Sequence, residues 1–413
     1  MERFDFDTVI DRKNTSCLKY DFAGEYGVPE DTLPFWIADM DFKVADCITD
    51  ALRDRVEHGI YGYSDTGVSY FRALAGWEKK HFNWDIRPEW LIKTPGVVPA
   101  INITVKALTK ENDAVLINQP VYHPFHAAIT QNNRKLINSP LILKDGRYEI
   151  DFADLEEKIK TYKVKAAILC SPHNPVGRVW TIEELRAYAE ICRKYNIAVI
   201  CDEIHADFVF KGHKHIPFAS VSEDAADRSV TCTAPSKTFN IAGLQTSNIL
   251  IPNESIRNKF KSALDSFGYE RPNVMGIIAA EAAYRGGEEW LAAGWGYIEN
   301  NLAFTKKFLA GRLPKMKLIE PEGTYLLWID CNAYDITDKE LENKLLYDAK
   351  LWLDMGSMFG PEGNKFFRFN IACPKSVLEK GLDRLAEVFH SLKVGRGGGN
   401  IGLADVQVVD LRS

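Results

Sequence analysis

Short apolar runs alternate with amphipathic segments through the middle of the chain, from about residue 90 to residue 250. In most of these runs apolar residues stand at successive positions rather than at every second one. Such runs are typical of strands buried on both faces, as in a parallel sheet that helices cover on both sides. We therefore predict strands at Ala114–Asn118, Ala166–Cys170, Ala198–Cys201, Ser229–Cys232 and Asn248–Ile251.

Apolar residues spaced three and four apart predict helices before and between these strands. Ile48, Leu52 and Val56 share one helical face, and Gly59 follows it as a stop signal. A helix over Thr181–Tyr195 opens with Thr and, three residues later, Glu, which is the pattern of a capping box. Strands that alternate with helices predict an α/β fold: a three-layer α/β/α domain with a mainly parallel sheet.

The remainder of the chain has a different pattern. Residues 253–312 are largely helical, and residues 316–392 combine strands at Tyr325–Ile329 and Phe366–Phe369 with a helix from Lys375 to Leu392. This order predicts a smaller α+β domain. We therefore divide the chain into an N-terminal segment that packs with the small domain, a large ligand-binding domain, the small C-terminal domain and a Gly-rich tail outside the fold, over residues 1–50, 51–289, 290–393 and 394–413.

Composition and charge exclude several classes of protein. The chain has 413 residues and a net charge of -6, which argues against nucleic acid as a partner because nucleic-acid-binding proteins carry a basic face. No apolar run approaches the ~18 residues of a membrane span, so we expect no membrane partner. The opening sequence MERFD lacks the apolar region of a signal peptide, and we expect a cytoplasmic protein. The eight cysteines form no close pairs, and His123 and His126 lack nearby Cys or Asp, so we predict neither a metal site nor a disulfide framework.

Glycine and aromatic residues follow two of the apolar runs at the points where they end, which is the edge at which α/β sheets bind ligands. Gly96 lies in a turn and, with Val97 and Val98, opens a helix whose free N–H groups suit a phosphate. The same pattern also fits an ordinary strand–helix turn. Tyr122 follows the next strand and fits either a ring that stacks on a planar cofactor or a tyrosine of the core.

Two further strands are followed by groups that could bind a heteroaromatic ring. Asn174 lies in the turn sequence Asn-Pro-Val-Gly, which could point its amide N–H at a phenolate oxygen. Asp202 follows the strand that ends at Cys201, where a carboxylate can keep a pyridinium nitrogen protonated and make the ring an electron sink. Asp202 could equally cap a helix. His205 falls near the same edge of the sheet.

Lys237 follows the strand that ends at Cys232, beside Ser236 and Thr238. A lysine at the end of a buried strand loses hydration and can titrate near neutral pH, which is the property of a lysine that forms a Schiff base. A solvated surface lysine is the alternative. The conjunction of Lys237 with the groups that follow the other strands favours a shared site.

With these motifs the chain resembles the fold-type-I pyridoxal-5′-phosphate enzymes of the class I/II aminotransferase superfamily. It is most similar to their cystathionine β-lyase, or cysteine–sulfur lyase, branch. The resemblance runs from Phe4 to about Leu392. It includes Phe6–Arg12, Ala38–Phe42, Tyr61–Tyr63, Asn174-Pro175 with Gly177, Asp202–His205, Ser236–Ile241 and Arg368–Asn370.

The resemblance implies the PLP-dependent transferase fold, with pyridoxal 5′-phosphate as the cofactor in the large domain. It makes Lys237 the residue that bonds the cofactor covalently and later acts as the base, and Asp202 the partner of the pyridine nitrogen. Tyr122 would stack on the ring and take part in catalysis, and Asn174 would bond the phenolate oxygen. The remaining cofactor contacts would come from Gly96, Val97, Val98, His205 and Ser236.

The substrate contacts and the partner that the resemblance implies lie elsewhere in the sequence. Arg368 would bind the α-carboxylate of an amino-acid substrate through a bidentate pair, with Asp39 and Tyr122 nearby. Without the resemblance, Arg368 could equally be a surface charge on a strand edge. The active site would lie at a homodimer interface, where Tyr63 reaches the phosphate in the neighbouring subunit.

Two positions bear on the assignment. Aminotransferases usually have Tyr three residues after the Asp, where this chain has His205, as the lyase branch does. Three residues before the lysine, where a phosphate-binding Ser is common, this chain has Ala234. The phosphate contacts of this loop would therefore come from Ser236 or Thr233.

The function that follows from the resemblance is β-elimination, which cleaves the C–S bond of L-cystathionine or another cysteine S-conjugate to a thiol, pyruvate and ammonia. A PLP-dependent aminotransferase is the first alternative, because it uses the same cofactor and the same base. A regulatory protein that binds a partner on this fold is an alternative of another class.

Overall fold

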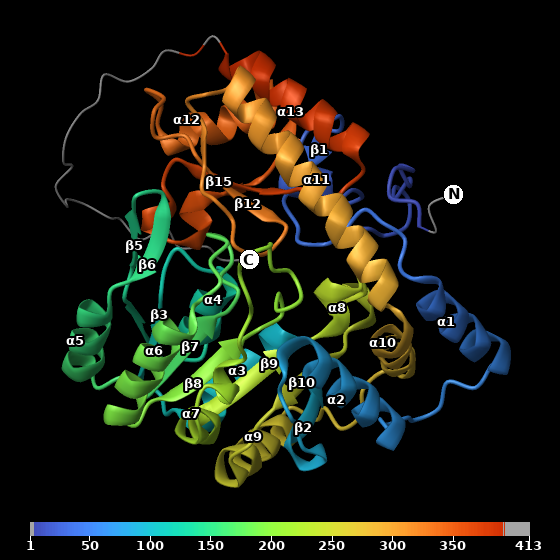
Figure 1. The fold of residues 1–413 in the computed structure, drawn as a ribbon, viewed down its shortest axis with the longest axis vertical. Helices are drawn as coiled ribbons and strands as arrows, with labels where there is room; N and C mark the ends of the chain where they lie inside the picture. The colour runs from blue at the N-terminus through green and yellow to red at the C-terminus, as the bar shows by residue number, and fades with distance from the viewer. Residues whose placement is uncertain (1–3, 391, 393–413) are drawn as a thin grey trace.

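The computed structural model describes residues 4–390 and 392, and a seven-stranded sheet forms the core of its larger part, in the lower half of Figure 1. The strand order is β2-β10-β9-β8-β7-β3-β4. β10 is antiparallel to both neighbours, and the other pairs are parallel. The strands are β2 (Leu91–Thr94), β3 (Ala114–Ile117), β4 (Lys135–Asn138), β7 (Ala166–Cys170), β8 (Ala198–Asp202), β9 (Ser229–Thr233) and β10 (Ser247–Leu250). The predicted mainly parallel sheet is confirmed.

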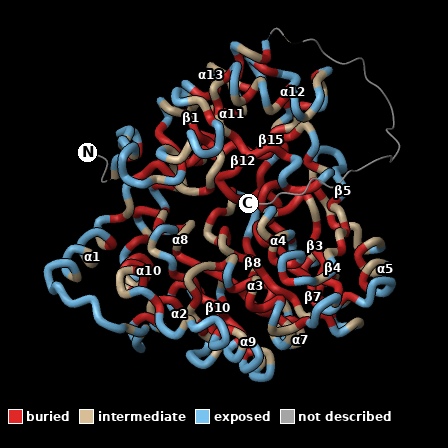
Figure 2. Tube along the Cα trace, turned by 180° about the vertical axis from the view of Figure 1, so that it is seen from behind, coloured by how far each residue is buried: buried red, intermediate tan, exposed pale blue. Residues whose placement is uncertain are grey.

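Two layers of helices cover this sheet, because successive residues of each strand pack on opposite sides. In β7, Ile168 packs in one apolar cluster with α3 (Val97–Leu108), α4 (Pro124–Thr130) and α9 (Glu254–Ser266). Its neighbour Leu169 packs in another with α5 (Phe152–Tyr162), α6 (Ile182–Lys194) and α7 (Glu223–Arg228). The predicted capping box at the start of α6 is present, with Thr181 and Glu184 as its members. The three-layer α/β/α arrangement is therefore confirmed, and most of its strands are buried (Figure 2).

A smaller antiparallel sheet follows in the chain, with the order β11-β12-β15-β14. Its strands are β11 (Lys317–Leu318), β12 (Leu326–Asp330), β14 (Asp354–Met355) and β15 (Phe366–Asn370). In Figure 1, α11 (Glu288–Arg312) and α13 (Lys375–Phe389) lie over this sheet. The smaller α+β part agrees with the sequence pattern. The boundaries drawn at residues 50 and 289 stay predictions, and the predicted tail 394–413 lies outside the described residues.

The remaining elements join these two parts or lie at their edges. They are α1 (Asp46–His58), α2 (Val68–Phe82), α8 (Pro235–Thr238), α10 (Val274–Gly286), α12 (Asp338–Asn343), β1 (Leu33–Pro34), β5 (Leu141–Lys144), β6 (Arg147–Ile150) and β13 (Leu351–Trp352). Short helical turns occur at η1 (Ala23–Tyr26), η2 (Pro88–Trp90), η3 (Phe218–Ser220), η4 (Ala242–Leu244), η5 (Lys344–Asp348), η6 (Gly356–Phe359) and η7 (Pro361–Gly363). As predicted, Gly59 ends α1, and its φ of 73° is a left-handed conformation that glycine adopts without strain. Among the described helices, none is long and apolar enough to cross a membrane.

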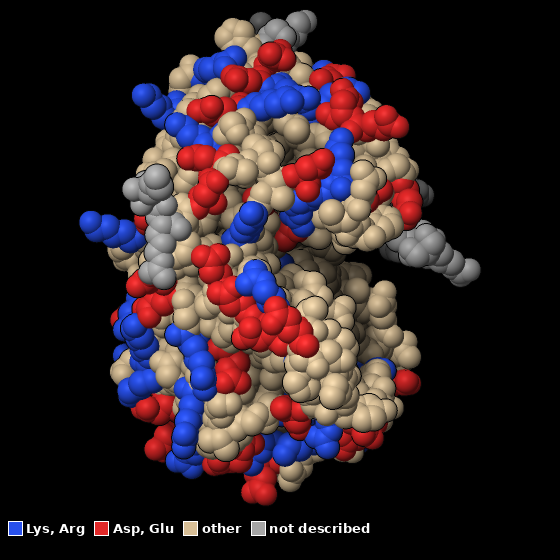
Figure 3. Space-filling view, turned by 90° about the vertical axis from the view of Figure 1, so that its right-hand side faces the viewer, with Lys and Arg blue, Asp and Glu red and all other residues tan. Residues whose placement is uncertain are grey.

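Acidic and basic side chains are interspersed over the face shown in Figure 3, which is hollowed at mid-height. Because both signs of charge occur side by side, this face does not present one continuous basic surface.

The N-terminal segment is tied to the smaller sheet before it reaches the large one. β1 pairs in parallel with β13, and the ring of Phe35 stacks on Phe369 of β15 with 4.5 Å between centroids. The backbone N–H of Asn370 donates to the carbonyl of Phe35 at 3.0 Å. These contacts fix the start of the segment that continues to residue 42 and crosses the site described below.

We expect Gly381→Ala in α13 to destabilise the protein by about 1–3 kcal/mol, because a Cβ there would lie 2.7 Å from ring carbons of Phe35 and overpack the core. Gly296→Ala in α11 is the matched control, since its Cβ would meet nothing within 4 Å. The free energy of unfolding of the control should rise by up to about 1 kcal/mol, because Ala has a higher helix propensity than Gly. Urea unfolding of both variants measures the difference, and equal midpoints would contradict this packing.

Candidate active site

A cavity of about 210 Å³ lies at the edge of the large sheet where β8 and β9 end. Parallel strands bring their carboxyl ends to one edge, so residues that are far apart in sequence meet there. Most of the predicted site residues line this cavity: Gly96, Val97, Val98, Tyr122, Asn174, Asp202, His205, Ser236 and Lys237. Arg368, Asp39 and Tyr63 do not line it.

Lys237 lies in α8, a single helical turn that follows β9. Its Nζ donates a hydrogen bond of 2.6 Å to the carbonyl of Ala38, which also accepts one from the Tyr325 hydroxyl at 3.1 Å. Burial lowers the pKa of Lys237 to about 8; the charge of Arg368 acts in the same direction, and those of Asp39 and Asp202 oppose it. A substantial fraction of the amine is therefore neutral near physiological pH, and a neutral amine is nucleophilic and basic.

Asp202 is the last residue of β8 and is buried. One carboxylate oxygen accepts from the N–H of Ile204 at 3.2 Å, and the side chain makes no other hydrogen bond within the described residues. Burial raises the pKa of Asp202 to about 7, although the nearby Lys237 charge opposes the shift. A buried carboxyl with a free oxygen in a cavity is suited to an N–H⁺ group of a ligand.

Two aromatic side chains complete the walls near these groups. Burial, with the charges of Lys237 and Arg368, lowers the pKa of His205 to about 3, so its ring is neutral. Nδ1 of His205 is buried without a hydrogen-bond partner in the structure. Burial raises the pKa of Tyr122 to about 12, so its hydroxyl stays protonated. The cavity thus has two uncharged aromatic rings in its wall, beside one amine and one carboxyl group.

The N-terminus of α3 forms the end of the cavity that suits an anion. Gly96 is the N-cap residue and Val97 and Val98 begin the helix, so their N–H groups have no partner within the helix. The hydroxyl groups of Ser236 and Thr246 lie in the same lining. Together these donors and the helix dipole favour a phosphate group.

Ala234 lines a different, smaller cavity, together with Thr233. Ala234 occupies the position at which a phosphate-binding Ser is common, and it therefore lies outside the lining of the large cavity. Of the two residues predicted to replace it, Ser236 lines the large cavity and Thr233 does not.

Arg368 lies in β15 behind Asn174 and is 3% exposed. Its guanidinium donates to Asn174 Oδ1 at 3.0 Å and to the carbonyl of Trp36 at 2.7 Å, and it pairs with Asp354 on the adjacent strand. Its Nε is buried without a partner in the structure. Arg368 is thus an internal residue rather than a surface charge, and Asn174 connects it to the cavity.

Asp39 lies in the segment that crosses from the small sheet to Lys237. It forms ion pairs with Arg12 at 2.6 Å and Lys19 at 3.4 Å, and it lines a hollow that adjoins the large cavity at Ala242. The segment itself is held by two asparagines. Asn370 donates to the carbonyls of Ile37 and Asp39, and Asn240 bonds the N–H of Met40 and the carbonyls of Met40 and Phe42.

Tyr63 lies in the connection between α1 and α2 and is fully exposed, away from the cavity of its own chain. Its predicted role in a neighbouring subunit stays a prediction.

The sequence interpretation missed Gln245 and Thr246, which also line the cavity. They precede β10 instead of following it. Because β10 runs antiparallel, its amino end lies at the edge where the other strands end. The sequence interpretation considered only residues that follow strands and therefore could not find them. A prediction that β10 runs antiparallel would have indicated the residues before it.

Comparisons with known proteins agree with this geometry. The family model of aminotransferase class I and II matches residues 31–385. The chain belongs to this family. It is 43% identical to cystathionine beta-lyase PatB of Bacillus subtilis over 92% of this chain and 98% of that protein.

Two solved structures are similar over nearly their whole length. Cystalysin from Treponema denticola, which contains pyridoxal 5′-phosphate, has a TM-score of 0.90 and 39% identity, covering 93% of this chain and 98% of that one. The PLP-bound C-S lyase from Staphylococcus hominis has a TM-score of 0.87 and 34% identity, covering 94% and 98%.

The lowered pKa of Lys237 predicts how cofactor-free protein takes up pyridoxal phosphate. The neutral amine is the reactive form, so the rate of uptake should rise with pH through about 8 and then level off. Asp39→Asn removes the largest charge that raises this pKa, so the profile should move to lower pH. Stopped-flow absorbance measures the profile, with the exposed Asp11→Asn as control. An unchanged profile in Asp39→Asn would contradict the assigned electrostatics.

Proposed function

We propose that this chain is a pyridoxal-phosphate-dependent carbon–sulfur lyase, which cleaves L-cystathionine or another cysteine S-conjugate to a thiol, pyruvate and ammonia. The observation that carries the proposal is one cavity that contains a partly neutral lysine amine, a buried carboxyl group and a helix N-terminus. The similarity to PatB and cystalysin over nearly the whole chain supports the choice of reaction.

The residues of the cavity fit the cofactor. The N–H groups of Val97 and Val98 and the hydroxyl of Ser236 would bind its phosphate, and Asp202 would accept a hydrogen bond from its ring nitrogen. Tyr122 and His205 would lie against the ring, and Asn174 would donate to its phenolate oxygen. Lys237 would bond its aldehyde carbon.

Each residue then has a task that its environment permits. When bound, pyridoxal phosphate supplies an aldehyde that takes up the substrate amine and a ring that withdraws electrons from Cα. Arg368 would hold the α-carboxylate and so orient the Cα–H bond; its guanidinium lies next to the cavity, where it donates to Asn174 of the lining. Lys237 would remove the Cα proton, because its lowered pKa makes it a base near neutral pH.

Elimination follows from the leaving group on Cβ. A thiolate on Cβ departs with the C–S bond electrons, and hydrolysis of the remaining three-carbon fragment gives pyruvate and ammonia. An aminotransferase would use the same base to return the proton to the cofactor and would need a keto acid. His205, where aminotransferases usually have Tyr, and the similarity to PatB favour elimination.

A homodimer is also part of the proposal. The end of α1, the start of α2 and the connection between them expose several apolar side chains close together in sequence, and such residues are typical of a protein interface. They are Val56, Ile60, Tyr61, Tyr63 and Val68. A second copy of the chain would cover them and bring Tyr63 to the phosphate end of its neighbour's cavity.

Purified enzyme incubated with L-cystathionine and no keto acid should release pyruvate and thiol in equal amounts. Lys237→Ala should lose this activity by at least about 10²-fold, since it removes the general base. Coupled lactate dehydrogenase and thiol assays measure the two products. Pyruvate formation that requires an added keto acid would instead establish an aminotransferase.

Mixed dimers test the role of Tyr63. Tyr63→Ala and Lys237→Ala should each be nearly inactive, whereas refolding them together should restore roughly a quarter of the wild-type sites, because mixed dimers contain one intact site. Activity after mixing is the measurement, and light scattering gives the oligomeric state. A Tyr63→Ala variant with full activity, or a monomer, would rule out the shared site.

A further inference from the structure

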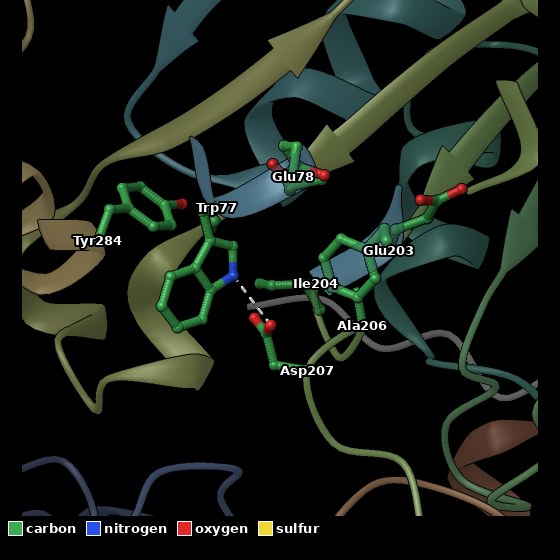
Figure 4. A pocket seen from close by; sticks show the side chains of 10 residues that line it. Trp77, Glu78, Glu203, Ile204, Ala206, Asp207 and Tyr284 are labelled. Atoms are coloured by element: carbon green, nitrogen blue, oxygen red, sulfur yellow. Dashed lines mark hydrogen bonds between the residues drawn. The ribbon is translucent and has the colours of Figure 1, made fainter. Parts of the chain in front are cut away.

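A second, smaller cavity adjoins the cofactor site. It measures about 10 Å³, which is the space of a single water molecule. Ile204 lines both cavities and forms part of the wall between them. Figure 4 shows Glu78, Glu203 and Asp207 arranged around the small cavity, with Trp77 bonded to Asp207.

Two of these three carboxyl groups have their hydrogen bonds satisfied. Glu203 accepts from the N–H of Phe218 at 2.9 Å and contacts His215 Nε2 at 3.1 Å. Asp207 accepts from Trp77 Nε1 at 3.0 Å and from the Thr238 hydroxyl at 2.6 Å.

Glu78 is the exception. It is 3% exposed, it lines the cavity, and it makes no hydrogen bond or ion pair to any described residue. A buried carboxyl group without a partner is strongly destabilising, and water commonly satisfies such groups where a polar cavity is large enough. The cavity has both the size and the polar lining that a water molecule needs.

The charges around the cavity favour a proton on Glu78. Within residues 4–390, no Lys or Arg lines it, whereas two further carboxyl groups do. Burial raises the pKa of Glu78 well above its usual value, and the charges of Asp207 and Glu203 add to the shift. Burial also raises the pKa of Asp207, but the hydrogen bonds from Thr238 and Trp77 oppose that shift, whereas no hydrogen bond from a described residue opposes it at Glu78.

Other titratable groups that face this cluster include His81 of α2, His215 of the loop after β8 and Tyr284 of α10. Cys201 and Asp202 of β8 and Cys232 of β9 lie near Glu203. His215 lies against Glu203, and His81 stacks on Trp77, so neither contacts Glu78.

We propose that Glu78 is a neutral carboxylic acid and that one buried water molecule joins it to the carboxylate of Asp207, which thereby anchors the Lys237 turn to α2. The acid donates to the water and the water donates to Asp207, whose carboxylate can accept more than two hydrogen bonds. Asp207 holds Thr238, the neighbour of Lys237, and α8 is a single turn that cannot maintain its own position.

Glu78 and Asp207 are thus positioning residues for Lys237. They act through Thr238 from behind the wall of the site, and none of them contacts the cofactor cavity. The inference does not depend on which reaction the site catalyses.

The holoenzyme and its Glu78→Gln and Glu78→Leu variants test the proposal. Gln keeps a neutral donor of the same shape, whereas Leu removes the donor. A carboxyl group whose pKa is raised by folding stabilises less as pH rises above its ordinary value of 4.5. Between pH ~5 and ~8 the unfolding equilibrium of wild type relative to Glu78→Gln should therefore shift toward unfolding by up to about tenfold per pH unit. The exposed Glu157→Gln should show no such pH-dependent difference from wild type.

Three further measurements test the position of the Lys237 turn and the presence of the water. Amide hydrogen exchange over residues 235–241 should accelerate in Glu78→Leu and stay at the wild-type rate in Glu78→Gln. The pH midpoint of the bound cofactor's absorption change should move only in the Leu variant. A crystal structure that resolves ordered waters should show one in the cavity. The proposal would be overturned by an empty cavity, or by amide exchange that is equal in both variants. It would also be overturned if the unfolding equilibria of Glu78→Gln and wild type changed with pH in parallel.

Discussion

Desolvation at the carboxyl edge of the large sheet is the constraint on which the site depends. The ordinary pKa values of a lysine and an aspartate are 10.5 and 3.8, and burial brings those of Lys237 and Asp202 to about 8 and about 7. Two groups that would hold opposite, fixed charges in water therefore both titrate near neutral pH. Without the covering helices and the N-terminal segment, water would restore their ordinary behaviour.

The N-terminal segment supplies much of that cover and also connects the two sheets. Phe35 packs on β15, and three residues later the carbonyl of Ala38 receives the amine of Lys237. Asn240 and Asn370 fasten the residues between and after them by side-chain bonds to the backbone. A movement of the small sheet would therefore also move the carbonyl of Ala38, which accepts the hydrogen bond from Lys237.

The loop after β8 serves two cavities because its side chains point in different directions. Asp202 and His205 face the cofactor site, whereas Glu203 and Asp207 face the small cavity behind it. The chemistry and its mechanical support are thus encoded within six consecutive residues. A substitution in this loop that changes one cavity can therefore also change the position of residues that line the other.

Sequence alone determined the five inner strands of the large sheet, the three-layer arrangement and the grouping of Lys237, Asp202, Asn174 and Tyr122, because apolar runs and the residues that follow them are local signals. It did not predict the edge strand β4, in which only two of four residues are apolar. The tertiary structure decided what depends on contacts between distant segments. The antiparallel direction of β10 brought Gln245 and Thr246 into the cavity, and the pairing of β14 with β15 placed Asp354 beside Arg368. In the sequence, Glu78 is one charged residue in an amphipathic helix. Only the packing of α2 against the β8 loop and α10 removes its carboxyl group from bulk water and raises its pKa.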